Sequence, residues 1–405
     1  MSEAAKIDHY QQAFETLCDR RLVQSMYSEC DVLMERVLLT LHGQEHTLRR
    51  ALELKLFRRD FTRYYEKEVY PQTLAATLAP YLRQGSMDLH EFGVRVNLNL
   101  ASDIAGIDRD IDSATERACL LEIVRKFGEG ATLFHSTRNK DDVRQEVAEA
   151  LALFDSRFFQ PSMCRREQLL ADIDAGNLAA EQAPRDILTV LLQSRNAQDL
   201  DEAMIRREVA FFMQAATHSS ANAMVHAFHH IHTWCLSHTK DALRLTTDPL
   251  FLQHCVHESL RLHPASPVAW RTAACPFALV NGISVAEGAA VVVDLQTANQ
   301  DPSAFGGAPE MFDPHRVTEA RIPPYGLTFG VGVHTCFGRD LAGGTLPQAD
   351  TDPDNHHYGT LTSLLRNLFE HNVRPDPDRA PIVDADTQRK NWRHYPVLLD
   401  AKEIL

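Results

Sequence analysis

The sequence has 405 residues, 44% of them apolar, and a formal net charge of −14 at pH 7. This length and composition suffice for a large buried core, in one big domain or two smaller ones. The acidic balance argues against a general affinity for nucleic acid or anionic membranes, although a local basic face is compatible with it. The eight cysteines are scattered and form no CxxC pair, which disfavours a disulfide framework or a structural zinc site and favours a reducing compartment.

The N-terminal stretch "MSEAAKIDHYQQAF" lacks the charged and apolar regions of a signal peptide. No apolar run approaches the length of about eighteen residues that spans a bilayer. We therefore expect a soluble, cytoplasmic protein with no membrane span.

Apolar residues at three- and four-residue spacing dominate the chain and predict a mainly α fold with small β-sheets. The predicted helices cover residues 49–66, 69–82, 120–127, 141–154, 185–192, about 201–237, and 249–262. The stretches "VAWRTAA", "FALVNGISV" and "AAVVVDL" predict short strands in the C-terminal third. A polar, turn-rich stretch at residues 343–359 interrupts what would otherwise be one helix after Cys336.

The segment "FGVGVHTCFGRD" holds one cysteine in a loop rich in glycine. Glycines at 330, 332 and 338 allow the backbone to approach a flat partner, and Phe329 can shield the sulfur of Cys336. A helix that begins directly after Cys336 would aim its first amides at that sulfur and lower its pKa. Taken alone, the pattern is equally compatible with a glycine-rich turn around an inert cysteine.

Three further motifs accompany this loop in a fixed order. "ESLRLHP" holds Glu258 and Arg261 one helical turn apart, "ANQDP" follows at 298–302, and "FDPHR" ends at Arg316. With "FGVGVHTCFG", these segments resemble the Glu-x-x-Arg, ANRDP, FxPxR and haem-binding signatures of the cytochrome P450 family, soluble bacterial type. The resemblance covers most of the chain and implies a single domain over residues 1–405.

The resemblance implies that the protein binds haem b (iron protoporphyrin IX). Cys336 would be the axial ligand of the iron, with Phe329 and Gly338 beside it. Glu258, Arg261 and Arg316 would form a buried structural network. In "GQEHTLRR" and "VAWRTA", the resemblance assigns the haem propionates to His46, Arg50 and Arg271, together with His334.

The long helix at 201–237 departs from the family at its oxygen-activating pair. Where the family has a pattern like Ala-Gly-x-Glu-Thr, this chain reads Ala215, Ala216, Thr217, His218, Ser219. Ser219 and His218 are the predicted catalytic residues, with His218 relaying protons to the Ser219 hydroxyl. Two other interpretations stay open: the pair is lost and the protein uses peroxide or rearranges its substrate, or ordered water carries the protons.

Further along the same helix, "VHAFHHIHTW" places His226 and His230 one turn apart. No carboxylate or cysteine nearby completes a metal site, so we interpret this stretch as a histidine-rich helix face.

Two other departures from the family affect its surface. The chain reaches His46 early, so the N-terminal region is shorter than usual, and the 343–359 stretch is an insertion near the side where reductants dock. Residues 49–67 contain seven basic and three acidic residues. This excess of positive charge predicts a docking site for an acidic ferredoxin-type electron donor. The basic residues are Arg49, Arg50, Lys55, Arg58, Arg59, Arg63 and Lys67, and the acidic ones are Glu53, Asp60 and Glu66.

The predicted function is a haem-thiolate monooxygenase that uses dioxygen to oxidise a small organic substrate. The alternatives are a peroxide-using peroxygenase or haem-dependent rearrangement enzyme and, outside catalysis, a haem sensor or carrier. No motif reports the substrate, for which an apolar or amphipathic small molecule is the family's default.

Overall fold

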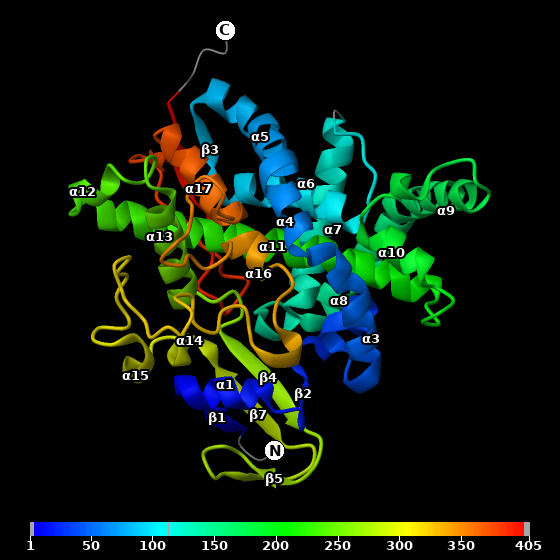
Figure 1. Cartoon of the computed structure of the whole chain (residues 1–405), viewed down its shortest axis with the longest axis horizontal. Helices are drawn as coiled ribbons and strands as arrows, with labels where there is room; N and C mark the ends of the chain where they lie inside the picture. Colours follow the sequence, from blue (N-terminus) through cyan, green and yellow to red (C-terminus); the bar gives the residue numbers. More distant parts are fainter. Residues whose placement is uncertain (1–3, 112, 401–405) are drawn as a thin grey trace.

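The computed structural model describes residues 4–111 and 113–400. Its longest helix, α11 (Glu202–Cys235), runs through the middle of the molecule and packs against α6 (Leu89–Ala105), α7 (Ala114–Ala131) and α13 (Pro249–Leu262) (Figure 1). The mainly α class with small sheets is confirmed. Within the described ranges, no helix has the length and apolar character needed to cross a membrane.

The remaining α-helices are α1 (Tyr10–Cys18), α2 (Asp31–Met34), α3 (Gly43–Glu53), α4 (Arg59–Tyr64), α5 (Tyr70–Gln84), α8 (Lys140–Phe154), α9 (Gln160–Asp174), α10 (Ile187–Gln193), α12 (Thr239–Ala242), α14 (Leu295–Ala298), α15 (Pro302–Phe305), α16 (Arg339–Gly343) and α17 (Thr360–Glu370). Most of them lie around α11, whereas α1, α14 and α15 lie toward the end of the molecule that carries the four-stranded sheet (Figure 1). A π-helical turn, η4 (Tyr65–Val69), links α4 to α5.

A four-stranded sheet lies at one end of the molecule, where α1 packs against it (Figure 1). Its order is β1 (Ala5–Ile7), β7 (Ala290–Asp294), β4 (Val268–Ala273) and β2 (Leu22–Gln24), with β1 parallel to β7 and the other pairs antiparallel. The predicted strands became β4, β7 and the hairpin β5 (Phe277–Ala278) with β6 (Ser284–Val285). β1 and β2 were not predicted, because three residues are too few for an alternating pattern.

The smaller pairings lie in the C-terminal part and near α6. β11 (Pro396–Leu398) pairs with β3 (Ser86–Asp88) and β8 (Arg374–Pro375), and β9 (Ile382–Val383) pairs with β10 (Trp392–His394). The segment between β9 and β10 contributes one side chain to the cavity described below.

The predicted helix at 49–66 is wrong as a single element. α3 ends at Glu53, and α4 begins only after Arg58, whose backbone is extended with ψ of 157°. Leu52 and Leu56 are buried four residues apart, but the next buried apolar side chain, Phe61, follows after five. This step breaks the helical phase, so the two apolar segments cannot share one face of one helix.

α6 was missed for the opposite reason. Its buried residues include Leu89, Val94, Leu98 and Ser102, which point in different directions around the helix, and its exposed residues are Glu91 and Arg95 alone. A helix that is buried over most of its surface has no distinct apolar stripe, so periodicity alone gives no clear signal for it.

The 343–359 stretch forms the predicted polar loop between α16 and α17. Gly344 and Gly359, at its two ends, both have positive φ, and a Cβ on Gly359 would lie 2.4 Å from the backbone nitrogen of Gly344. The backbone N–H of Thr345 donates to the carbonyl oxygen of His357 at 2.9 Å. The loop therefore leaves the helix pair and returns to it at one point.

Candidate functional site

A cavity of about 380 Å³ lies between the middle of α11, α3, β4 and the loop that carries Cys336. Most of its wall is apolar, with Leu38, Leu100, Phe211 and Leu295 among the lining residues. A larger hollow of about 700 Å³ lies elsewhere, is lined by the ion pair of Arg166 with Asp186, and contains none of the predicted site residues. The smaller cavity is the candidate site.

Two glycines in the left-handed region shape the loop that carries Cys336. Gly330 and Gly332 have φ of 64° and 71°, which favours glycine. A Cβ on Gly332 would lie 3.0 Å from the carbonyl oxygen of Leu17, at the end of α1. The backbone N–H of Cys336 donates to the carbonyl oxygen of Phe329 at 2.8 Å, and the Cys336 side chain lines the cavity.

The sulfur of Cys336 is subject to opposing electrostatic effects. The Cys336 side chain is accessible on the cavity wall, but the protein that surrounds it raises the pKa of the thiol by desolvation, and the backbone N–H of Gly338 and the charges of Arg50 and Arg339 act in the opposite direction. Gly338 and Arg339 stand at the start of α16, so the first amides of this helix lie beside the sulfur as the sequence predicts. A bound cation would complete the stabilisation of the thiolate.

The predicted propionate-binding residues meet next to this loop. Arg50 donates from Nη2 to the carbonyl oxygen of Thr335 at 2.6 Å, and its guanidinium lies 4.3 Å from the ring centre of Phe337. The ring centres of His46 and His334 are 4.6 Å apart. Burial first, and then the neighbouring charges and imidazoles, lower the pKa of His334 to about 3.

Arg271, on β4, completes this basic cluster. Its Nη1 donates to Oε1 of Gln24 at 2.7 Å, and burial lowers its pKa to about 10. Nε2 of His46 is buried and lacks a hydrogen-bond partner within the described residues. The described lining of the cavity contains neither Asp nor Glu. The cluster thus fits an anionic group with several oxygen atoms, as the haem propionates are, and Cys336 fits a thiolate ligand to iron.

Behind the cavity, Glu258 and Arg261 form a bidentate ion pair on α13. Arg261 donates from Nε at 2.8 Å and from Nη2 at 2.7 Å, and both side chains are almost completely buried. Nε of Arg316 donates to Glu258 at 3.0 Å. Nη1 of Arg261 also donates to the carbonyl oxygens of Asn299 and Pro309 at 2.7 and 2.6 Å. The structure thus brings Glu258, Arg261 and Arg316 into one network.

The "ANQDP" segment connects this network to the loop that carries Cys336. Asn299 accepts the backbone N–H of Leu327 at 2.7 Å and donates to the carbonyl oxygen of Arg261 at 3.1 Å. A Cβ on Gly326 would lie 2.3 Å from Oδ1 of Asn299. The segment before the Cys336 loop is therefore fixed on a buried side chain.

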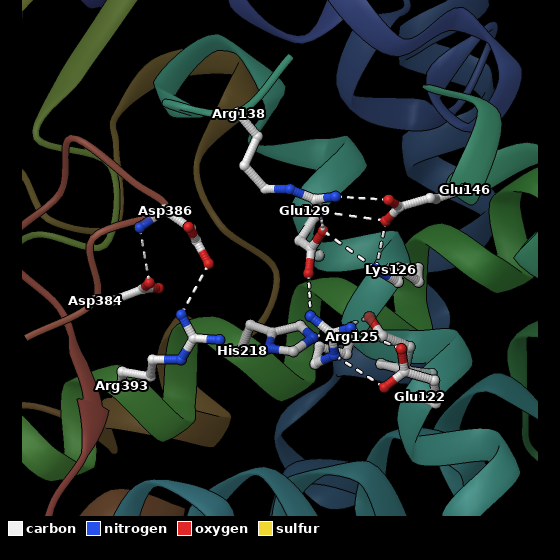
Figure 2. A network of polar contacts seen from close by, with 12 residues as sticks. Glu122, Arg125, Lys126, Glu129, Arg138, Glu146, His218, Asp384, Asp386 and Arg393 are labelled. Atoms are coloured by element: carbon white, nitrogen blue, oxygen red, sulfur yellow. Dashed lines mark hydrogen bonds and ion pairs between the residues drawn. The ribbon is translucent and has the colours of Figure 1, made fainter. Parts of the chain in front are cut away.

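His218 and Ser219 lie beside the cavity, but their side chains have partners within the protein. The His218 ring packs against Gly128 of α7 and its Nε2 lies 2.9 Å from the carbonyl oxygen of Val124. Figure 2 shows this ring next to α7. Ser219 donates to the carbonyl oxygen of Ala215 at 2.7 Å. Burial lowers the pKa of His218 to about 4, so the ring is neutral near pH 7, and the catalytic role of the pair stays a prediction.

The histidine-rich stretch of α11 packs inside the protein. His226 stacks on His263 with ring centres 4.1 Å apart, and His230 lies 3.0 Å from the hydroxyl of Ser259. Within residues 4–111 and 113–400, no group of three or more His, Cys, Asp or Glu side chains is arranged to hold a metal ion. These histidines fill the core as neutral rings, because burial lowers the pKa of each to about 3.

Two features of the site had no sequence signal. Glu66, on η4, accepts the backbone N–H groups of Tyr358 and Gly359 at 2.8 Å each and hydrogen-bonds the ring of His357, which attaches the 343–359 loop to η4. Arg389, in the C-terminal part, lines the cavity. Neither residue belongs to a motif, and Glu66 meets its partners only through the fold.

Comparison with known proteins finds similarity to one family. The model of the family described as "Cytochrome P450" matches residues 243–346, which contain the Glu258–Arg261 pair and Cys336. A cytochrome P450 714C2 of Oryza sativa subsp. japonica is 31% identical over 131 residues, 31% of this chain and 23% of the relative. The chain spans less than half the length of the first four curated relatives it matches.

Longer matches are more distant. Pulcherriminic acid synthase of Bacillus subtilis (strain 168) is 22% identical over 319 residues, 77% of this chain and 71% of the relative. The crystal structure of CalO2 superposes with a TM-score of 0.74 over 99% of this chain and 91% of CalO2, at 18% identity. The structure of P450BioI with a ligated acyl carrier protein has a TM-score of 0.71, covers 97% of this chain and 92% of P450BioI, and is 18% identical. These similarities establish the fold.

Proposed function

The chain belongs to the cytochrome P450 family, and from this premise we propose that it is a haem-thiolate monooxygenase acting on a small organic substrate. Members of the family bind haem b. The observation that supports the proposal best is the position of Cys336 on the wall of an apolar cavity, beside the cluster of His46, Arg50, Arg271 and His334.

Each part of the cavity has a task in this proposal. Haem ligated by a thiolate supplies oxidising chemistry with dioxygen. Cys336 would hold the iron, while the four basic side chains would bind the two propionates and fix the orientation of the ring. The apolar residues along α11, such as Phe211 and Phe212, would exclude water and hold the organic substrate against the reactive face.

The protein must also deliver protons to the cavity. In the proposal Ser219 delivers these protons. Its side chain lies on the cavity wall, and its hydroxyl can rotate away from the carbonyl oxygen of Ala215 and donate into the cavity. His218 would take part only if its ring left Val124, because its Nε2 is bonded there. Ordered water beside Ser219 is the alternative route.

The electron donor in this proposal is an acidic ferredoxin that docks on the basic side of α4. Arg58 and Arg59 are exposed there. The neighbouring Arg63 and Lys67 donate to backbone carbonyl oxygens of the 343–359 loop, at 2.8 and 3.3 Å. The loop therefore occupies part of the basic segment and narrows the surface that a donor would meet.

A peroxygenase is the second candidate function, and two observations favour it. The pair of His218 and Ser219 lacks a carboxylic acid. The 343–359 loop covers part of the basic surface on which a donor would dock. An enzyme that uses hydrogen peroxide needs no electron donor, because peroxide is already reduced by two electrons relative to dioxygen; one of its oxygen atoms enters the substrate and the other leaves as water.

Carbon monoxide binding to the reduced protein tests the proposal. The wild type is expected to give the red-shifted absorption band of a thiolate-ligated haem, and Cys336→Ala is expected to lose it. Cys164→Ala, which alters an exposed cysteine, is the matched control. A band that persists in Cys336→Ala overturns the ligand assignment. Turnover with a reduced ferredoxin system, compared with hydrogen peroxide alone, separates the two candidate functions.

A further inference from the structure

Arg389 places a third guanidinium on the cavity wall, in addition to those of Arg50 and Arg271. It belongs to the segment between β9 and β10 and lines the cavity. Its Nη1 donates to the carbonyl oxygen of Ala265 at 2.9 Å. Its Nε is buried, and no described residue accepts a hydrogen bond from it.

The segment that carries Arg389 is held in place from several sides. The backbone N–H of Gln388 donates to the carbonyl oxygen of His135 at 2.8 Å, and Thr387 forms a bridge with Ser136. On the other side, Asn391 hydrogen-bonds the buried ring of His226. The backbone at Arg389 is therefore fixed before any ligand binds, which reduces the entropy lost on binding.

The charge of Arg389 has no carboxylate partner in the described chain. The two acids of its own segment are engaged elsewhere: Asp386 accepts from Arg393 at 2.9 Å, and Asp384 accepts the backbone N–H of Asp386 at 3.1 Å (Figure 2). The described cavity lining contains no Asp or Glu. Burial lowers the pKa of Arg389, and the hydroxyl of Tyr27 is the group that opposes this effect among the described residues.

The hydrogen-bond partners of Arg389 differ from those of the basic cluster, although the hydroxyl of Tyr27 acts on the charges of both Arg389 and Arg271. Arg50 contacts the Cys336 loop and Arg271 contacts Gln24, whereas Arg389 contacts Ala265. Burial, followed by the charge of Arg389, lowers the pKa of His135 to about 4, so this neighbour stays neutral. A buried cation without a counter-ion destabilises a protein unless a ligand neutralises it.

We propose that Arg389 binds a carboxylate of the substrate, so that the enzyme selects organic acids whose apolar part lies along α11. This inference rests on the proposed function, because it assigns the substrate class of the same cavity. The planar guanidinium, fixed at Nη1, offers its remaining N–H groups to a carboxylate in the fork geometry that arginine favours.

Isothermal titration calorimetry with matched ligands tests the proposal. The probes are phenylalkanoates of increasing chain length, each compared with its own primary amide. For at least one length, the wild type is expected to bind the carboxylate at least about tenfold more tightly than the amide. Equal affinities at every length, or no binding of any carboxylate, overturn the proposal.

Variants assign the effect to the guanidinium. Arg389→Met is expected to remove the preference for the carboxylate, and Arg389→Lys to retain part of it. Lys390→Met, which alters an exposed side chain of the same segment, is expected to keep the full preference. An undiminished preference in folded Arg389→Met overturns the assignment, and if that variant does not fold, the wild-type comparison decides alone.

The carbon monoxide spectrum of each protein separates this inference from the proposed function. A thiolate band without a carboxylate preference leaves the monooxygenase proposal intact and overturns the substrate class. A carboxylate preference that Arg389→Met removes, in a protein without the band, supports the Arg389 site and contradicts the haem-thiolate function.

Discussion

The carboxylate of Glu66 and the imidazole of His357 hydrogen-bond each other inside the protein, although 291 residues of sequence separate them. His357 lies 2.7 Å from the carbonyl oxygen of Asp340 through its other ring nitrogen, so this pair joins η4, α16 and the 343–359 loop. Asp340 lies only four positions after Cys336 in the sequence. The contacts of His357 therefore hold the 343–359 loop and also the start of α16, next to Cys336.

Replacing Glu66 with alanine should release the loop. The substitution leaves the N–H groups of Tyr358 and Gly359 without their acceptor, at a cost of about 1–3 kcal/mol for each group left buried. Hydrogen–deuterium exchange should show faster exchange over residues 343–359. Glu68→Ala, on the exposed side of η4, is the control and should leave exchange unchanged. Equal protection of the loop in both variants contradicts its attachment by Glu66.

Removing one partner of the Glu258–Arg261 pair should prevent stable folding. Arg261→Ala leaves a buried carboxylate with only Arg316 and one backbone N–H, and breaking such a pair costs about 3–5 kcal/mol. The yield of folded protein with haem should fall sharply. Arg366→Ala removes an exposed helical ion pair with Glu370 and should cost less than about 1 kcal/mol. Normal yield of Arg261→Ala would show that the pair is dispensable.

The protein should lose stability in mild acid. Burial depresses the pKa of His226 to about 3, so below about pH 6.5 the unfolded chain takes up a proton that the native state excludes. The free energy of unfolding should therefore fall as the pH drops from 7 to 5, by about 2 kcal/mol for this residue. Urea unfolding of His226→Phe should show a correspondingly smaller fall. His238→Phe, at an exposed histidine stacked on Trp234, should behave like the wild type.

Ser219→Ala should alter oxygen use and leave substrate binding intact. The substrate-induced change in the haem spectrum should persist, while more of the electrons supplied end in released peroxide. Ser220→Ala, at the next position on the cavity wall, is the control. Peroxide release per electron, measured for both variants and for His218→Ala, decides the assignment. Unchanged release in Ser219→Ala and His218→Ala leaves ordered water as the proton source.

Reversing the charge of Arg58 and Arg59 should slow electron transfer from an acidic ferredoxin. Both side chains are exposed, so the double change to glutamate should lower the rate about tenfold at low salt. High salt should bring variant and wild type together, since screening acts over about 8 Å at physiological ionic strength. Arg83→Glu, on exposed α5, is the control. Rates that ignore both the reversal and the salt concentration would place the donor elsewhere.

The sequence predicts those parts of the molecule whose signal is local. α11 and α13 have periodic apolar residues and β7 is a run of valines, so each could be located before the structure was known. Gly330 and Gly332 need their positive φ angles wherever the loop lies, so their spacing carries the loop geometry, whereas Gly338 has a φ of −76° that any residue adopts.

The other features depend on contacts that no local pattern encodes. His218 lies at the expected position on α11, but its ring turns toward α7 because Gly128 leaves room there. Arg389 is one of several polar residues near the C-terminus, and only the folded chain brings it into the cavity.

Because Gly344 and Gly359 lie against each other, the 343–359 loop is a place where another protein segment can be inserted. A segment whose ends touch can be shortened, lengthened or exchanged for a fused electron-transfer module without separating α16 from α17, since closing a longer loop adds little entropy cost. Such a module would be joined to the protein close to the loop that carries Cys336. Its effective concentration there would be high, so electron transfer would not depend on the diffusion of a separate donor.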